Sequence, residues 1–318
     1  MRILAIRFAR FGDIVLLLPA LRLLKARLPD SHLTFLTDAR WRDLAAMCPA
    51  IDEVLTMDRI GMRDGSSIRA LADILRFGGD VRRMKFDAVI DFHGFRETNL
   101  IAWWSRAPER LGLQRADQSF LPFCFNRPAV LEDKAIHVSE MFIRVVDQFV
   151  PARDSHRLSP SLVVPDQALR WAKENIPNTF AVLYVDAPVK ERIWPLDRFA
   201  SLADYLAKKD KGEVILVTGS GQPVPALPPS VRVLSNLTIP QLAATIAAAR
   251  LLVSNDTGPM HLGPSLGIPT VGLFSVGLPL HFRPTGQWDT YVQGNPIESI
   301  ELGPVVEAVE RVCAAIDR

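Results

Sequence analysis

Short runs of apolar, often β-branched residues alternate along the first half of the chain with longer segments of helical periodicity. The predicted strands span 2–8, 32–37, 52–57 and 86–92, and the predicted helices lie around 16–28, 41–47, 66–84 and 137–150. The intervening stretch 106–136 has no clear period, and we expect it to be irregular. Strands that alternate with helices in this way are typical of βα units, which form a mostly parallel sheet.

The same alternation returns in the second half. The predicted strands span 180–186, 213–219, 231–235, 251–256 and 270–274, and helices are expected at 197–208, after Thr238, near 259–266 and at 304–317. Thr238 is a favourable N-cap, and Pro240 suits the first turn of the helix that follows it. The second half therefore predicts another α/β sheet.

A polar interval with three prolines, residues 151–166, separates the two halves and is typical of a domain boundary. At 318 residues and 48% hydrophobic composition, the chain is long enough for two cores. We predict two α/β domains, residues 1–160 and 161–318.

The charge balance and the cysteines exclude several classes of protein. Lys and Arg number 37 against 35 Asp and Glu, a net charge of +2, which lacks the cationic excess of a dedicated nucleic-acid binder. The three cysteines form no CxxC pair, so no zinc site is expected, and they fit a reducing compartment. Neither a signal peptide nor a run of about 18 apolar residues is found, and we expect a cytoplasmic protein.

Parallel sheets bind ligands beyond the carboxyl ends of their strands, and two such domains facing each other would enclose a cleft. Asp13 follows the first predicted strand, close to Arg10. An aspartate there commonly caps the next helix. Pro19, however, favours a helix that begins after Asp13, and a carboxylate outside the helix could accept a proton from a bound hydroxyl. Both interpretations are open at this point.

Two further predicted strands are followed by residues that could bind a diphosphate. After residues 251–256, the turn at Asp256, Thr257 and Gly258 suits a diphosphate, because glycine permits close approach to backbone N–H groups. An Asx turn explains the first two residues equally well, and His261 one turn later is consistent with a buried histidine.

After residues 180–186, Lys190 and Arg192 could hold phosphate oxygens and neutralise a departing diphosphate. A solvated charged loop anchored by Trp194 is the alternative. His93 and Arg96, after the fourth predicted strand, are weaker candidates. The chain has no Walker, HExxH or DxD motif, so a carboxylate-bound divalent metal is not expected.

Six motifs distributed from end to end carry a family resemblance. They are GDIVLLLPAL, DFHGF, RLGL, HVSEMF, RIWPLDRFASLA and SNDTGPMHLGPSLGIPTVGLF. With them the chain resembles the bacterial heptosyltransferases of glycosyltransferase family 9. The resemblance implies a GT-B arrangement, in which two Rossmann-like domains have parallel sheets facing across a cleft, and a terminal helix at about 304–317 that packs back on the first domain.

The resemblance also implies an inverting, metal-independent transferase that moves heptose from ADP-heptose to the lipopolysaccharide inner core without a cofactor. It makes Asp13 the catalytic base and the second domain the donor-binding domain. The implied donor-binding residues are Lys190, Arg192, Gln222, Asp256, Thr257, Gly258 and His261, and the candidate acceptor-binding residues are Arg10, His93 and Arg96.

Three departures from the family pattern concern the donor. Arg192 stands where a lysine is usual, Gln222 stands where a glutamate is common, and the segment SNLTIPQLA lacks the usual Gly-Lys. A different nucleotide sugar or acceptor, a sugar-nucleotide epimerase and a non-catalytic GT-B subunit therefore remain alternatives.

The expected partners are a nucleotide-sugar donor and an anionic glycolipid acceptor, with peripheral contact at the inner face of the cytoplasmic membrane and no nucleic acid. An anionic acceptor would suit the arginines of the first domain, which ordinary surface arginines explain equally well. These are Arg7, Arg10, Arg63, Arg96, Arg106, Arg110 and Arg115.

Overall fold

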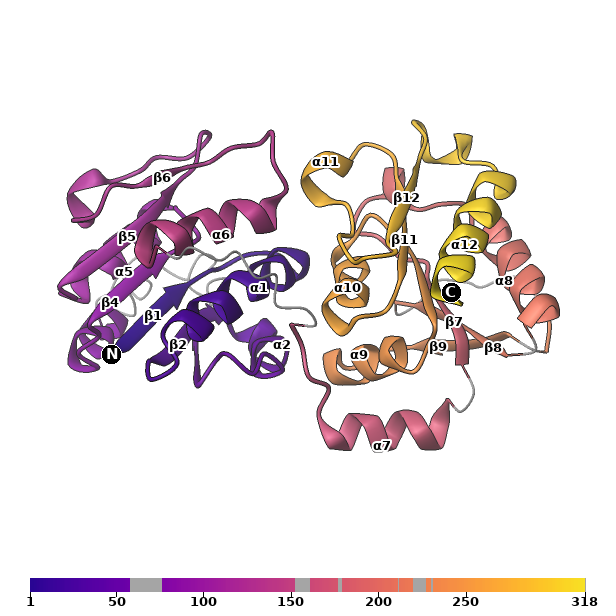
Figure 1. Cartoon of the computed structure of the whole chain (residues 1–318), viewed down its shortest axis with the longest axis horizontal. Helices are drawn as coiled ribbons and strands as arrows, with labels where there is room; N and C mark the ends of the chain where they lie inside the picture. Colours follow the sequence, from indigo (N-terminus) through magenta and orange to yellow (C-terminus); the bar gives the residue numbers. More distant parts are fainter. Residues whose placement is uncertain are drawn as a thin grey trace. The chain divides into compact units, whose positions relative to one another are not determined.

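The computed structural model describes residues 1–57, 76–151, 161–176, 179–210, 212–219, 227–229 and 231–317. The chain divides into two compact units, Met1–Leu158 and Ser159–Arg318 (Figure 1). Each unit has one six-stranded sheet with helices around it, so both halves of the chain form the α/β structure that the sequence predicts.

The sheet of the first unit is parallel throughout. Its strands are β1 (Arg2–Ile6), β2 (His32–Asp38), β3 (Glu53–Met57), β4 (Ala88–Asp91), β5 (Glu109–Gln114) and β6 (Val130–Leu131). They lie in the order β3-β2-β1-β4-β5-β6, with Ile3 of β1 opposite Leu33 of β2 on one side and Ala88 of β4 on the other. Because the central strands are covered on both faces, they are continuous apolar runs.

The helices of the first unit are α1 (Phe11–Arg27), α2 (Arg42–Ala46), α5 (Arg96–Trp104) and α6 (Val138–Phe149), with short 3-10 turns η1 (Ala39–Trp41) and η2 (Pro122–Cys124). Residues 76–83 are also helical, and the rest of the helix predicted at 66–84 lies outside the described residues. The expectation of a late start for α1 is wrong, because the helix begins at Phe11 and continues through Pro19.

Packing against α6 compensates for the internal proline of α1. Pro19 has no N–H to offer to the carbonyl of Val15 four residues earlier, which weakens the helix at this turn. At the neighbouring position, the Ser139 hydroxyl of α6 donates a hydrogen bond to the Leu16 carbonyl at 2.9 Å. The two helices pack against each other along apolar side chains that are buried on both, so tertiary packing overrides the local cost of the proline.

The prediction that residues 106–136 are irregular is wrong at β5. Gly112 lies inside this strand and weakens its sequence signal, since glycine has low strand propensity. A Cβ at position 112 would lie 2.6 Å from the Phe125 ring, so the strand needs glycine to let that ring pack against it. The requirement comes from a residue outside the strand, and no local pattern reveals it.

The second unit repeats this architecture. Its strands are β7 (Thr179–Tyr184), β8 (Glu213–Thr218), β9 (Val231–Ser235), β10 (Leu251–Asn255), β11 (Thr270–Phe274) and β12 (Thr290–Gln293). All pair in parallel, in the order β12-β11-β10-β7-β8-β9. The helices and 3-10 turns are α7 (Asp166–Asn175), η3 (Lys190–Arg192), α8 (Leu196–Asp210), α9 (Ile239–Ala247), η4 (Gly258–His261), α10 (Leu262–Leu266), α11 (Pro279–Phe282), η5 (Ile297–Ser299) and α12 (Leu302–Ile316).

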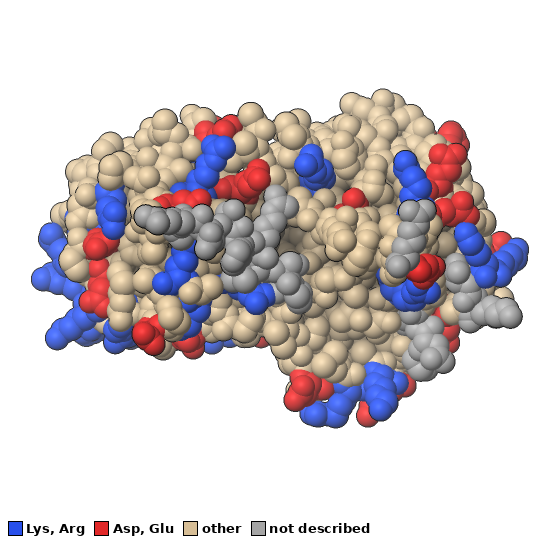
Figure 2. Space-filling model, in the orientation of Figure 1, with Lys and Arg blue, Asp and Glu red and all other residues tan. Residues whose placement is uncertain are grey.

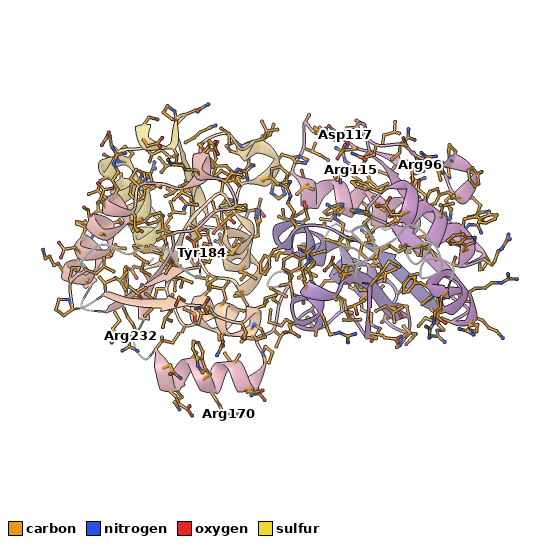
Figure 3. The ribbon with its side chains drawn as sticks, turned by 180° about the vertical axis from the view of Figure 1, so that it is seen from behind. Arg96, Arg115, Asp117, Arg170, Tyr184 and Arg232 are labelled. Carbon is orange, nitrogen blue, oxygen red and sulfur yellow. The ribbon has the colours of Figure 1, made fainter. Side chains whose placement is uncertain are left out.

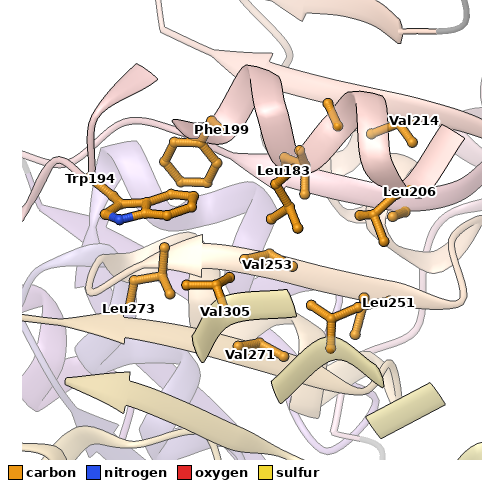
Figure 4. Close-up of a cluster of buried hydrophobic side chains, with 14 of the residues drawn as sticks. Leu183, Trp194, Phe199, Leu206, Val214, Leu251, Val253, Val271, Leu273 and Val305 are labelled. Carbon is orange, nitrogen blue, oxygen red and sulfur yellow. The ribbon is translucent and has the colours of Figure 1, made fainter. Parts of the chain in front are cut away.

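The main core of the second unit lies between the sheet, α8 and α12 (Figure 4). Trp194 and Phe199 are fully buried there, with ring centroids 4.9 Å apart and nearly perpendicular planes. The Trp194 indole N–H donates to the Ile300 carbonyl at 2.7 Å, so the one polar atom of this ring is satisfied inside the core. Thr238 caps α9 as predicted, and Gln241 completes a capping box.

The terminal helix α12 packs within the second unit, and its expected packing on the first domain stays a prediction. Its apolar side joins the core of the second unit, where the helix packs against α8 and β12. The reason is its stripe of buried residues Val305, Ala308, Val309 and Val312, which meets the sheet and α8. The strand β12 and the helices α5, α7 and α11 are not among the sequence-based predictions.

Charges of both signs are interspersed on the faces of the two units seen in Figure 2. This agrees with the nearly balanced composition. Within the part of the chain that the structure describes, no helix is long and apolar enough to cross a membrane.

Candidate active site

The strand orders define one ligand-binding position in each sheet. In both units the first strand of the sheet pairs with the fourth, and the chain runs outward in opposite directions from this pair. At such a switch point the loops after the two strands turn to opposite faces of the sheet and leave a crevice at the carboxyl ends. The pairs are β1 with β4 in the first unit and β7 with β10 in the second.

The switch point of the first unit brings Asp13 together with Arg7. The carboxylate Oδ1 of Asp13 lies 3.3 Å from Nη2 of Arg7, and the side chain of Asp13 is 27% exposed. Asp13 lies in the first turn of α1 and not at the N-cap, which is Arg10. The interpretation of Asp13 as a capping residue is therefore wrong, and its carboxylate is an ion-pair partner that solvent can reach.

The loop after β4 is built on a buried aspartate. Asp91 is fully buried and accepts hydrogen bonds from the backbone N–H groups of His93 at 2.9 Å and Gly94 at 3.1 Å, and from the Asn99 side chain at 2.8 Å. Burial raises the pKa of Asp91, and these hydrogen bonds oppose that rise. Gly94 has a φ of +73°, and a Cβ there would collide with the Leu113 carbonyl, so the DFHGF turn requires glycine.

The candidate acceptor residues differ in accessibility. His93 is nearly fully buried, stacked on Phe95 with ring centroids 4.1 Å apart. Arg96 is exposed at the start of α5, and Arg10 is exposed at the N-cap of α1. Figure 3 shows Arg96 and Arg115 from behind.

Several of the arginines considered for an anionic acceptor have internal partners. Arg7 is buried, Arg110 donates to the carbonyls of Cys124 and Ala107, and Arg115 pairs with Glu132 at 3.4 Å. Arg63 lies outside the described residues. Among the described arginines of that set, those classed as exposed are Arg10, Arg96 and Arg106.

The switch point of the second unit brings Arg192 and Asp256 together. Arg192 Nη1 lies 3.1 Å from Oδ2 of Asp256 and donates to the Asp256 backbone carbonyl at 3.3 Å. The Arg192 side chain is 30% exposed, whereas the Asp256 side chain is 5% exposed. Burial raises the pKa of Asp256, and the charge of Arg192 opposes that rise. The pair leaves an arginine open to solvent above a buried carboxylate.

Three residues that the sequence analysis did not assign contact either the loop of Arg192 or Asp256 itself. Asn255 is fully buried and bridges two loop segments: its side chain accepts from the Trp194 N–H at 3.1 Å and donates to the Val185 carbonyl at 2.7 Å. Ser275, after β11, donates to the Glu191 carbonyl. Gly277 lies against Asp256, where a larger residue would meet the carboxylate. Asn255 could have been found from its place at the end of a predicted strand, whereas the other two contacts have no local signal.

Four of the remaining donor candidates lie in the segments that follow β7 and β10. Lys190 is exposed in η3, Thr257 and His261 are buried, and Gly258 begins η4. Gln222 lies outside the described residues. Over the described ranges, no group of three His, Cys, Asp or Glu side chains is arranged to hold a metal ion.

The fold and a family match together define the class of this protein. The two parallel six-stranded sheets correspond to the two-domain GT-B fold of glycosyltransferases. The solved structure of the ADP-heptose LPS heptosyltransferase II of E. coli superposes with a TM-score of 0.82 over 100% of both chains, at 20% identity. The model of glycosyltransferase family 9 (heptosyltransferase) matches residues 74–303. The chain belongs to this family and is a glycosyltransferase.

Similar proteins carry related names. A "Putative glycosyltransferase" of Haemophilus influenzae is 23% identical over 316 residues, which cover 92% of this chain and 88% of the relative. "Lipopolysaccharide heptosyltransferase 2" of Salmonella typhimurium is 22% identical over 308 residues, which cover 88% of this chain and 84% of the relative. The similarity to these proteins therefore extends over both units.

Proposed function

We propose that this glycosyltransferase moves a heptose from ADP-heptose to the lipopolysaccharide inner core or a related acceptor, with inversion and with protein cations in place of a metal ion. The name of the family and the names of the similar proteins support heptose as the sugar and lipopolysaccharide as the product. The accessible carboxylate and the accessible guanidinium at the two switch points support the mechanism.

On the acceptor side, Asp13 is the proposed catalytic base. Its carboxylate is 27% exposed at the carboxyl end of β1, where a bound hydroxyl can reach it. Removing the hydroxyl proton as the oxygen attacks the anomeric carbon avoids a positively charged oxygen in the transition state. This accessible carboxylate at a switch point is the observation that carries the proposal.

On the donor side, Arg192 and Lys190 are the proposed cations for the diphosphate. Negative charge grows on the leaving group as the glycosidic bond breaks, and preorganised cations stabilise that charge more than they stabilise the ground state. Asp256 holds the guanidinium of Arg192 from the buried side, so the exposed side stays available to phosphate oxygens. We assign Gln222, Thr257, Gly258 and His261 to donor binding on the family resemblance alone.

The proposed acceptor is an anionic glycolipid, and the exposed residues Arg10 and Arg96 are its proposed contacts. We assign His93 to the acceptor site as a packed residue that shapes the loop. A lipid-linked acceptor implies that the enzyme works at the inner face of the cytoplasmic membrane, where anionic lipids attract basic residues.

Substitution Asp13→Asn tests the base. It keeps the shape of the side chain and removes the proton acceptor, and we expect turnover of ADP-heptose with a lipopolysaccharide inner-core acceptor to fall at least about 100-fold, the usual lower range for general-base loss. Asp43→Asn is the matched control, because Asp43 also lies in the first turn of a helix of the same unit. Near-parental turnover by a folded Asp13→Asn enzyme would exclude the base role.

A further inference from the structure

Arg7 is a buried charged residue that the proposed reaction does not use. It follows β1 directly, and only 2% of it is exposed. Its guanidinium lies 4.7 Å from the centre of the Phe142 ring, inside the apolar packing of α6. Burial lowers the pKa of Arg7, and the nearby carboxylate of Asp13 opposes that change. A charge kept in such a place needs specific partners.

The two partners of Arg7 lie on the two segments that follow β1 and β4, the strands of the first switch point. Nη2 lies 3.3 Å from Oδ1 of Asp13 after β1, and Nη1 donates to the Phe92 carbonyl after β4 at 2.6 Å. Phe92 is flanked by Asp91 and His93, and Asp91 already holds that turn by its hydrogen bonds to backbone N–H groups. Arg7 therefore joins the carboxylate of Asp13 to a rigid backbone position.

A direct contact with substrate does not explain Arg7, because its guanidinium has almost no exposed surface. A purely structural ion pair has a clear example in the same unit. Arg27 pairs with Asp147 at 2.7 Å and donates to the Val150 carbonyl at 3.0 Å, and its side chain is 9% exposed. The two arginines make the same kinds of contact, but only the carboxylate partner of Arg7 stands at a switch point.

We propose that Arg7 is a positioning residue that holds one oxygen of Asp13 against the turn after β4, so that the other oxygen faces the acceptor hydroxyl. This inference rests on the proposed function, because it assumes that Asp13 acts as the base. The planar guanidinium suits the task, since it donates in two fixed directions at once, to the carboxylate and to the carbonyl. Arg7 thereby links the geometry of the base to the loop that carries His93.

A double-mutant cycle with Asp13 tests the inference. We expect Arg7→Met to lower kcat about 10- to 100-fold, the range that follows from a misplacement of about 1 Å, with the KM for ADP-heptose changed less than about twofold. In an Asp13→Asn background, the same substitution should lower the residual single-turnover rate less than about threefold, because the group that Arg7 positions is no longer a base. Arg7→Lys should recover part of kcat, since an ammonium keeps one of the two contacts.

Arg27→Met is the matched control. It removes a carboxylate and a carbonyl contact of the same kind, so we expect a comparable fall in the thermal unfolding temperature and parental kcat. Should Arg7→Met fail to fold, Arg7→Lys takes its place in the cycle with an expected loss of about 3- to 10-fold, since it retains one of the two contacts.

The outcomes separate the inference from the proposed function. An equal loss of rate from Arg7→Met in both backgrounds would show a structural role and overturn the inference. Parental kcat in Arg7→Met, with Asp13→Asn inactive, would also overturn it and leave the base in place. Parental turnover by Asp13→Asn would instead overturn the proposed base itself, whatever the Arg7 variants do.

Discussion

Substitution of Gly277 tests whether the Arg192–Asp256 pair needs a small residue beside it. We assign Gly277 no contact with the donor, so an effect on the donor site would come through that pair. A Cβ at position 277 would lie 3.0 Å from Cγ of Asp256, closer still to its Oδ2, and 3.2 Å from the Phe274 ring. Ordinary contacts of a Cβ begin at about 3.4 Å. Asp256 is 4% exposed and pairs with Arg192 at 3.1 Å, so its carboxylate cannot retreat without disturbing that pair. The expected consequence of Gly277→Ala is a displaced carboxylate and a displaced guanidinium.

The magnitude follows from overpacking. Inserting a methyl group into a filled site costs about 1–3 kcal/mol in the free energy of unfolding. Glycine to alanine at a permissive backbone position instead stabilises by about 0.4–1 kcal/mol, so the sign of the change is diagnostic. A shift of about 1 Å in a positioned group lowers the rate about 100-fold, and we expect kcat/KM for ADP-heptose to fall by about that factor.

Urea unfolding measures the stability change, and calorimetric titration with ADP, the nucleotide of the proposed donor, measures the donor site without the acceptor. Gly303→Ala is the control, since Gly303 lies in α12 with no heavy atom within 4 Å of its added Cβ. It should stabilise the protein by up to about 1 kcal/mol and leave ADP affinity unchanged. A Gly277→Ala protein that is as stable as its parent and binds ADP equally well would refute the reasoning.

Two more predictions concern the second unit. Asn255→Ala leaves the Trp194 N–H and the Val185 carbonyl without their buried partner, so we expect the free energy of unfolding in urea to fall by about 2–5 kcal/mol. The control Asn175→Ala, at an exposed position, should lower it by less than about 1 kcal/mol. Equal losses would contradict the role of Asn255 as a bridge. Burial raises the pKa of Asp289 from 3.8 to about 6, so between these values the folded state keeps a proton that the unfolded chain releases. The stability that this proton supplies is complete below about pH 4 and is lost as the pH rises through about 6. Over that window Asp289→Asn should remove up to about 3 kcal/mol of pH dependence from the unfolding free energy, and an unchanged difference between pH 4 and pH 7 would show that Asp289 does not titrate in this way.

The elements that the sequence predicted are those whose signal is local. The apolar runs of β1, β2, β10 and β11 are buried on both faces of a parallel sheet, and each can be recognised within a few residues. Two errors of prediction, the missed strand β5 and the late start expected for α1, involve a residue that is explained only by a distant neighbour. Gly112 in β5 makes room for Phe125, and Pro19 in α1 is tolerated because α6 packs beside it.

For the candidate site, the sequence named the strand ends and therefore Asp13, Arg192 and Asp256. It did not reveal that Arg192 faces Asp256 from 64 residues away, or that Arg7 reaches Phe92 across 85 residues. Such contacts depend on which strands lie side by side, and many strand orders are compatible with the same local pattern.

What the sequence by itself determined is the alternation of strands and helices, the presence of two α/β halves and the chemistry that follows each strand. Only the tertiary structure decided that Arg7 is buried, that Gly277 must be small and that α12 packs in the second unit. The physical reason is that periodicity and capping act over a few residues, whereas burial and ion pairing are properties of side chains brought together by the order of the strands in each sheet.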